Sequence, residues 1–239
     1  MSDQQAITEM FDDISPRYDF LNHLLSFQID KIWRRKTSRL VAKCHPTAIL
    51  DVATGTADLA IRMAHDIPSV HITGVDLSEK MLGIGRQKVQ QKRLDQRITL
   101  MTADAARLPF ADNSFDAVTV AFGVRNFEHL EAGLKEMIRV VKNGGLVAIL
   151  EFSHPQRGIV KWPYRFYSKH LLPLIGRLFS KHQSAYTYLP SSIEAFPDSE
   201  SFIETLSHLG VSDIKGKAIC GGIATLYSGH VQKKPVMPQ

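Results

Sequence analysis

The sequence predicts an α/β protein of one domain, built on a seven-stranded, mainly parallel β-sheet with helices on both faces and an antiparallel hairpin at its C-terminal end. Short apolar segments of strand character alternate with helical segments, which is typical of parallel sheets because each crossover needs a helix. Only residues 220–222 separate the last two strand segments, so those two are expected to pair as a hairpin. The strand segments are 48–52, 71–75, 98–102, 115–122, 145–151, 211–219 and 223–232, and the helical segments are 57–66, 79–92, 128–142 and 198–209.

The first strand segment runs into a turn of small residues, Ala53-Thr54-Gly55-Thr56-Ala57, and helical spacing resumes after it. Ala53, Gly55 and Ala57 carry little or no side chain, so a ligand can approach the backbone closely. A strand, a tight turn and a helix start are typical of the opening of a nucleotide-binding domain. The turn has one glycine where the dinucleotide pattern has three, so a small-residue turn without a ligand is the alternative.

Three aspartates stand where three successive strand segments end: Asp51, Asp76 and Asp104. The carboxyl ends of neighbouring parallel strands meet at one edge of the sheet, where Asp76 can accept hydrogen bonds from both hydroxyls of a ribose. The alternative is that Asp76 caps the next helix, in competition with Ser78. An aspartate at position 104 can accept from an adenine amine. Together the three acids predict a nucleoside site.

Length and composition fit one domain with a full hydrophobic core, since 44 % of the 239 residues are hydrophobic. No apolar run approaches the roughly 18 residues of a membrane span, and the N-terminus lacks the pattern of a signal peptide. Cys44 and Cys220 lack metal-ligand spacing and are expected to be reduced thiols in the core, and no metal site is expected. These features predict a cytoplasmic protein.

Residues 4–43 precede the first strand segment and are expected to form a helical cap. Residues 6–11 have helical period, and Pro16 is expected to interrupt the helix. Tyr18, Asp19 and Asn22 are interleaved with apolar residues, which suggests an element lying over a cleft. The basic residues between 31 and 36 are interpreted as a solvated helix face.

The fourth strand segment is followed directly by Gly123-Val124-Arg125-Asn126. Ligands of open α/β sheets bind outside the carboxyl ends of the strands. Arg125 and Asn126 are therefore expected at the mouth of the site, and the alternative is a loop held by local hydrogen bonds.

A basic amphipathic insertion is expected over residues 154–195. Its part 154–190 has six Lys or Arg and no Asp or Glu, against a net charge of +5 for the whole chain. Arg157, Lys161, Arg165 and Lys169 recur every four residues, and aromatic and leucine residues lie among the six basic residues. This composition is typical of a helix in a membrane interface, and a helix packed on the sheet is the alternative. Nucleic acid fits less well, because the aromatics fall on the apolar side.

The strand order, the Asp-x-Ala-x-Gly-x-Ala turn with Asp76 and the antiparallel ending resemble a class I S-adenosylmethionine-dependent methyltransferase, which is Rossmann-like. Three narrower signatures resemble the UbiE/MenG/COQ5 family: Tyr18-Asp19-x-x-Asn22 with Ser26 and Trp33, Phe122-Gly123-Val124-Arg125-Asn126, and residues 139–145 running to Glu151-Phe152-Ser153. The resemblance covers residues 6 to 232. Asp30, Ala121 and Asn143 depart from the family pattern, and Ala121 is left out of the expected site because many members place a serine there.

This resemblance implies S-adenosylmethionine as cosubstrate and a polyprenyl quinol as methyl acceptor. Gly55, Thr56, Asp76, Asp104 and Ala105 are the expected cofactor-binding residues. Thr56 would donate its hydroxyl at the turn, Asp76 would take the ribose, and Asp104 with the backbone of Ala105 would bracket the adenine.

Methyl transfer to carbon needs an electron-rich ring, so the acceptor is expected to be the reduced quinol. Loss of a phenolic proton makes the ortho carbon nucleophilic, and in-line placement then largely suffices. Arg125 and Asn126 are the expected catalytic residues: Arg125 stabilises the developing phenolate, and Asn126 orients the other ring oxygen. The base is left open among His23, His154, Tyr18 and a water molecule.

The expected reaction converts demethylmenaquinol to menaquinol, and the alternative acceptor is the 2-methoxy-6-polyprenyl benzoquinol of ubiquinone biosynthesis. Because such quinols reside in the bilayer, transient attachment to the inner face of the membrane is expected, and a homodimer is left open. An NAD-dependent oxidoreductase is disfavoured by the missing glycines at 53 and 57 and by the closing hairpin. A non-catalytic membrane-surface module has no need of three strand-end acids.

Overall fold

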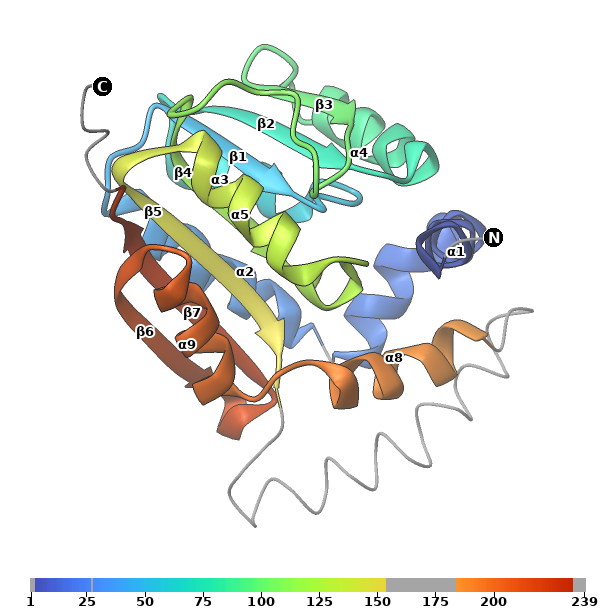
Figure 1. Cartoon of the computed structure of the whole chain (residues 1–239). Helices are drawn as coiled ribbons and strands as arrows, with labels where there is room; N and C mark the ends of the chain where they lie inside the picture. The colour runs from blue at the N-terminus through green and yellow to red at the C-terminus, as the bar shows by residue number, and fades with distance from the viewer. Residues whose placement is uncertain (1–2, 27, 154–183, 234–239) are drawn as a thin grey trace.

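The computed structural model describes residues 3–26, 28–153 and 184–233 of the chain (Figure 1). Its centre is a seven-stranded sheet with the strand order β3-β2-β1-β4-β5-β7-β6. The strands are β1 (Ala48–Val52), β2 (His71–Asp76), β3 (Ile98–Thr102), β4 (Phe115–Ala121), β5 (Val141–Phe152), β6 (Val211–Ile219) and β7 (Ala224–Val231).

The first five strands are parallel, whereas β7 pairs antiparallel with both β5 and β6. Strand β1 lies between β2 and β4, with Val52 opposite Val75 on one side and Val120 on the other. The carboxyl ends of these three strands therefore meet at one edge of the sheet. This architecture confirms the predicted fold class, including the antiparallel ending.

Helices cover both faces of the sheet (Figure 1). Successive strand residues point to opposite faces, so Ile49 packs in a core with α2, α3 and α4, while Leu50 packs in a second core with α5 and α9. The helices are α1 (Asp3–Leu25), α2 (Ile29–Ala42), α3 (Asp58–Asp66), α4 (Glu79–Gln91), α5 (Leu130–Val140), α8 (Ser184–Ala195) and α9 (Ser199–His208), with the short 3₁₀ turns η1 (Val124–Asn126) and η3 (Cys220–Gly222).

Helix α1 runs unbroken through Pro16, so the expected interruption at that residue is wrong. Proline has no N–H to donate to the carbonyl of Asp12, four residues earlier. The hydroxyl of Ser15 donates to that carbonyl instead, with 2.8 Å between Oγ and O. The backbone acceptor is satisfied in this way and the helix continues.

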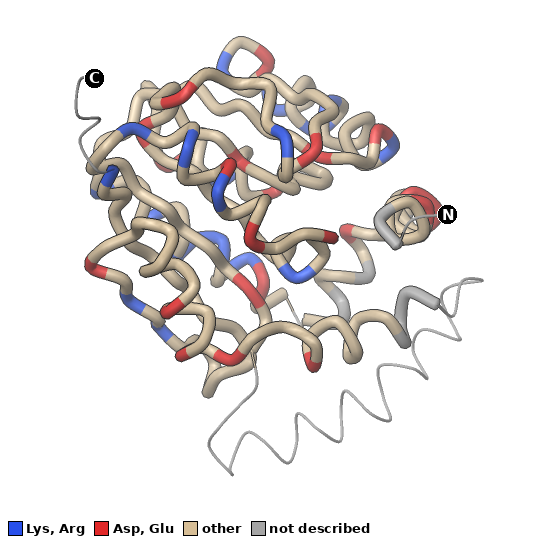
Figure 2. The backbone as a smooth tube through the Cα atoms, viewed as in Figure 1, with Lys and Arg blue, Asp and Glu red and all other residues tan. Residues whose placement is uncertain are grey.

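Charge complementarity holds α1 against α4. Figure 2 shows acidic residues on α1, and elsewhere in the described part acidic and basic residues are interspersed along the backbone. Asp19 accepts from Lys88 Nζ at 2.7 Å, and Asp12 lies 3.9 Å from Lys80 Nζ. These contacts place α1 beside the carboxyl ends of the strands.

The structure also bears on the expected insertion and on the two cysteines. Of the insertion expected at 154–195, residues 154–183 lie outside the described residues, and the remainder forms α8. Cys44 and Cys220 are free but exposed, so their expected place in the core is wrong: one follows the end of α2 and the other lies in the hairpin turn. Within the described ranges, we find no helix long and apolar enough to cross a bilayer.

Candidate active site

A pocket opens at the carboxyl ends of β1, β2 and β4. It holds about 740 Å³ of empty space, counting the part open to solvent. Of the residues expected in the site, Gly55, Asp76, Ala105 and Asn126 line this pocket. Helix α1 covers it with the side chains of Ile7, Phe11 and Tyr18. The expectation of a partly apolar, partly polar element over a cleft agrees with this placement.

The turn after β1 is built from residues in the left-handed region. Ala53, Gly55 and Ala57 have φ values of 51°, 55° and 65°. Such values strain alanine but not glycine. The N–H of Thr54 donates to the carbonyl of Val75 at 2.9 Å, which ties the turn to the end of β2. The turn thus brings small residues and bare backbone to the pocket wall.

Asp76 ends β2 beside this turn. One carboxylate oxygen accepts from the N–H of Gly55 at 2.8 Å, and the other accepts from the N–H of Ser78 at 2.9 Å. Burial raises the pKa of Asp76, although the backbone N–H groups oppose that shift. Ser78 caps α4 by accepting from the N–H of Met81 at 3.1 Å. Asp76 is therefore free of the capping role and lines the pocket.

The other two strand-end aspartates are differently placed. Asp51 is 1 % exposed, and its oxygens accept from the hydroxyls of Thr54 and Thr119 at 2.7 and 2.6 Å. Burial raises the pKa of Asp51 to about 6. Asp104 accepts from the N–H of Ala106 at 2.9 Å, within its own loop. In the described part of the chain, Asp76 is the one aspartate of the three that lines the pocket.

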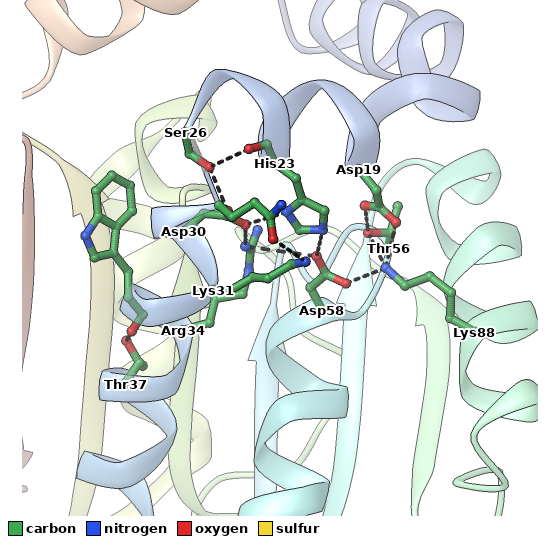
Figure 3. Close-up of polar contacts among 12 residues, drawn as sticks. Asp19, His23, Ser26, Asp30, Lys31, Arg34, Thr37, Thr56, Asp58 and Lys88 are labelled. Carbon is green, nitrogen blue, oxygen red and sulfur yellow. Dashed lines mark hydrogen bonds and ion pairs between the residues drawn. The ribbon is translucent and has the colours of Figure 1, made fainter.

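Thr56 faces α1. Its hydroxyl donates to Asp19 at 2.6 Å, and Lys88 lies 3.2 Å from the same hydroxyl (Figure 3). Lys88 also pairs with Asp58 at the start of α3. Thr56 is not among the residues that line the pocket. Its side chain joins the turn to the helix that covers the site.

The polar network of Figure 3 continues along α1 and α2. His23 Nδ1 and Ser26 Oγ lie 2.9 and 2.6 Å from the carboxylate oxygens of Asp30, which also pairs with Arg34. His23, Asp30 and Asp58 bring three potential metal-ligand atoms within 4.8 Å of one another. Burial opposes ionisation of both aspartates, but neighbouring cations and hydrogen bonds hold their pKa values below the usual range. The cations that balance these two carboxylates are Arg34, which pairs with Asp30, and Lys88, which pairs with Asp58.

Arg125 and Asn126 lie in η1, directly after β4. The guanidinium of Arg125 pairs with Glu151 at 2.7 Å, and these side chains are 6 % and 0 % exposed. Arg125 does not line the pocket among the described residues. Asn126 does, and its Oδ1 accepts from the hydroxyl of Tyr188 at 2.9 Å.

Aromatic side chains flank the same end of the sheet. Phe122 lines the pocket, and its ring lies 4.5 Å from that of Phe152 and 5.8 Å from that of Trp33, centroid to centroid. Phe127 lines the pocket as well. An apolar aromatic wall with a few polar groups suits a flat ring.

Of the candidates for the base, the structure describes Tyr18 and His23. Tyr18 lines the pocket, and burial raises its pKa, so it keeps its proton and serves as a donor at neutral pH. His23 is bonded to Asp30, away from the pocket-lining residues. His154 lies outside the described residues.

Sequence reasoning missed Glu151 and Tyr188 as parts of this site. Glu151 carried a usable signal, because an acid directly after the apolar run 146–150 stands at a strand end, as Asp76 does. The sequence contains no signal for Tyr188, because this residue bonds to Asn126 although the two are 62 positions apart in the chain.

Fold and pocket together define the class of protein. A putative S-adenosylmethionine-dependent methyltransferase from Methanococcus maripaludis superposes with a TM-score of 0.65 at 17 % identity, covering 95 % of each chain. The [4+2]-cyclase SpnF superposes with a TM-score of 0.64 at 20 % identity, covering 89 % of this chain and 74 % of the other. Identities this low show the fold alone, which is that of the class I methyltransferases.

The chain belongs to the ubiE/COQ5 methyltransferase family, whose sequence model matches residues 1–231. A demethylmenaquinone methyltransferase of Bacteroides fragilis is 46 % identical over 94 % of this chain and 91 % of its own. A second protein of that name, from Porphyromonas gingivalis, is 46 % identical over 94 % and 92 %. The ubiquinone/menaquinone biosynthesis C-methyltransferase UbiE of Geotalea daltonii is 48 % identical over 95 % and 96 %. The resemblance read from the sequence motifs is thereby confirmed.

Proposed function

We propose that this protein transfers the methyl group of S-adenosylmethionine to a ring carbon of a reduced polyprenyl quinone, and that demethylmenaquinol is the acceptor. One observation carries the proposal: Asp76 at the end of β2 and Asn126 after β4 line the same pocket, on either side of β1. A group suited to a ribose and a group suited to a ring oxygen thus share one cavity.

The cofactor side of the pocket fits a nucleoside. Asp76 offers carboxylate oxygens for ribose hydroxyls, and the space beside Gly55 is open, since an added Cβ there would meet no atom within 4 Å. Ala105 lines the pocket next to Asp104, where the adenine would lie. We assign Gly55, Asp76 and Ala105 direct contact. Thr56 and Asp104 support the same site by fixing the turn and the loop that carry them.

The acceptor side fits a flat ring with two oxygens. Phe122 and Phe127 offer apolar surface, and Asn126 offers an amide. Arg125 stands one residue before Asn126 and brings a guanidinium to this edge. We assign Arg125 and Asn126 the stabilisation of the negative charge that develops on a ring oxygen.

Bound S-adenosylmethionine supplies an electrophilic methyl group on a positively charged sulfur. The protein's task is to hold the reduced ring in line with that group and to favour the ionised phenol, because its charge makes the ortho carbon nucleophilic. The ring carbon then forms the new bond, the electron pair of the broken bond stays on sulfur, and the displaced ring proton leaves to solvent. Tyr18 remains a hydrogen-bond donor during this step.

The names of the relatives favour a naphthoquinol acceptor. Two are demethylmenaquinone methyltransferases, and the third is named for ubiquinone and menaquinone together. Menaquinone is the product class that all three names share. The purified protein should therefore methylate a short-chain demethylmenaquinol faster than a 2-methoxy-6-prenyl benzoquinol, measured by release of S-adenosylhomocysteine. Equal rates, or a faster benzoquinol, would overturn this choice of acceptor.

We further propose that the protein attaches transiently to the inner face of the membrane, where polyprenyl quinols reside. The support is the sequence of residues 154–190, whose six basic residues leave the rest of the chain close to neutral. Each Lys or Arg near an anionic surface contributes roughly 1 kcal/mol, so attachment would be reversible. A homodimer, left open by the sequence, is tested by sedimentation velocity of the purified protein.

A further inference from the structure

The two neighbouring residues of η1 are each held by a side chain from another element. Glu151 of β5 binds Arg125 twice: Oε1 accepts from Nη1 at 2.7 Å, and Oε2 accepts from the backbone N–H at 3.3 Å. The N–H of Phe152 donates to Oε1 at 2.8 Å, which fixes the carboxylate itself. Both side chains are buried, so this pair is not a surface contact, and its formation costs desolvation free energy.

The second clamp sets the direction of an amide. Tyr188 of α8 donates its hydroxyl hydrogen to Oδ1 of Asn126 at 2.9 Å. An asparagine side chain has one acceptor oxygen and one donor NH₂ group. Because this bond fixes the position of the oxygen, the NH₂ group on the other side of the amide is the donor that Asn126 can offer to the pocket that it lines.

Arg125 also has an N–H donor without a partner among the described residues. Its Nε is the one buried side-chain polar atom that lacks a hydrogen-bond partner in the described part of the chain. A buried donor without a partner is costly, and each such group calls for an explanation. An acceptor atom of a ligand bound beside η1 would supply the missing partner, although Arg125 itself is not among the described residues that line the pocket.

We propose that Glu151 and Tyr188 are positioning residues for the methyl acceptor, holding Arg125 and Asn126 so that a guanidinium N–H and an amide NH₂ are presented together to a ring oxygen. The inference rests on the proposed function and deepens it. Two fixed donors favour an oxygen that gains negative charge, which is the phenolate of the reduced ring. Glu151 and Tyr188 act through their neighbours and are not assigned contact with the ring.

The pair also sets the charge of the site. Arg125 and Glu151 together are neutral, and the other titratable or charged groups that they influence are Tyr18 of α1, Tyr188 of α8 and Tyr227 of β7. Arg34 of α2 acts on Tyr18 as well. If Glu151 loses its charge, the guanidinium is left uncompensated, and a bound phenol beside it ionises at lower pH. A residue that merely supports the fold would not produce that shift.

The first test removes one hydroxyl. Tyr188→Phe should lower kcat between about 10-fold and 10²-fold through misplacement of Asn126, with the affinity for S-adenosylhomocysteine unchanged. Tyr227→Phe is the matched control, since its hydroxyl bonds to Ser199 at the start of α9 and neither is among the described residues that line the pocket. That control should keep the wild-type kcat. Wild-type turnover in Tyr188→Phe overturns the role of Tyr188.

The second test removes one charge. Glu151→Gln should lower kcat and move the pH profile of kcat to lower pH, with a short-chain demethylmenaquinol as acceptor. Glu136→Gln is the control, because Glu136 also pairs with an arginine, Arg139, but outside the pocket lining. An unshifted profile in Glu151→Gln overturns its role. If that variant fails to fold, Glu151→Asp replaces it, and this shorter acid should lower kcat without moving the profile.

Activity of the wild type and activity of the variants separate the proposed function from the positioning roles. If the wild-type protein methylates no reduced quinone, the proposed function fails. If the wild type methylates the quinol and both variants do so equally well at every pH, the function stands and the positioning roles of Glu151 and Tyr188 are wrong.

Discussion

Thr56 donates its hydroxyl hydrogen to Asp19 across 2.6 Å, which bonds the turn after β1 to helix α1. Asp19 accepts from Lys88 as well, at 2.7 Å, so one carboxylate joins the turn, α1 and α4. Helix α1 covers the pocket, so these bonds hold the cover on the turn. The cover and the cofactor turn are thus coupled through a single side chain.

Asp19→Asn should loosen this cover. The amide keeps one acceptor oxygen but loses the charge that pairs with Lys88, and loss of a charge-assisted bond costs about 1–3 kcal/mol. Amide hydrogen exchange of residues 3–25 should become faster. Asp66→Asn is the control, since Asp66 pairs with Arg62 elsewhere on the surface. Unchanged exchange in α1 would show that Asp19 does not hold the helix.

Asp76→Ala should nearly abolish cofactor binding. The change removes the carboxylate expected to take the ribose, at a cost of about 2–4 kcal/mol in binding free energy. It also removes the acceptor of the Gly55 and Ser78 N–H groups, so thermal melting should fall slightly. Titration calorimetry with S-adenosylhomocysteine, well below the melting temperature, measures the loss. Asp95→Ala alters an exposed aspartate and should leave the affinity unchanged; wild-type affinity in Asp76→Ala would contradict the assignment.

Asp51 should make stability depend on pH. Burial raises the pKa of its carboxyl to about 6 in the folded protein, from 3.8. Between these values the folded state binds more protons than the unfolded state, so stability falls as pH rises, by up to about 1.4 kcal/mol per unit. Asp51→Asn has no proton to lose. The free energy of unfolding in urea, compared between wild type and variant, should therefore shift in favour of the variant by about 2 kcal/mol from pH 4 to pH 7. A constant difference across that range would show that Asp51 titrates normally.

Charge reversal in the insertion tests membrane attachment. Changing Lys161, Arg165 and Lys169 to Glu should abolish sedimentation with anionic liposomes, because the basic stripe supplies the attraction. S-adenosylhomocysteine binding should be kept, and high salt should weaken attachment of the wild type.

The matched control changes the same charge elsewhere. Lys92, Lys215 and Lys217 are exposed on other elements, and their replacement by Glu should leave sedimentation largely intact. If the stripe variant sediments as well as the wild type does, the stripe is a solvated face.

The sequence was enough for the fold and for the edge of the sheet that carries the site. Strand ends are visible in the chain because apolar runs stop there, so Asp76 and Asn126 could be predicted from their positions alone. Gly55 could be predicted because a tight turn needs small residues. These signals are local in the sequence, and the order of strands in the sheet brings the three residues together.

The directions in which side chains point could not be predicted from the sequence. Thr56 follows Gly55 directly, yet its hydroxyl turns to Asp19, 37 positions away, and so leaves the pocket lining. The side chain of Arg125 also turns to a distant residue, because it pairs with Glu151. Partners on distant elements decide which way a side chain points, and no local pattern records them. Pro16 shows the converse, since a single hydroxyl of Ser15 overrides a strong local signal.

Methyl transfer to carbon on a reduced quinone can be observed in the product itself. Its most direct measurement incubates the purified protein with S-adenosylmethionine carrying a deuterated, carbon-13 methyl group and a short-chain demethylmenaquinol kept reduced by dithionite. Mass spectrometry and carbon NMR of the product should find the labelled methyl on the ring carbon, and none when the oxidised quinone replaces the quinol. Label on a ring oxygen, label on the oxidised quinone, or no label on either would contradict the account.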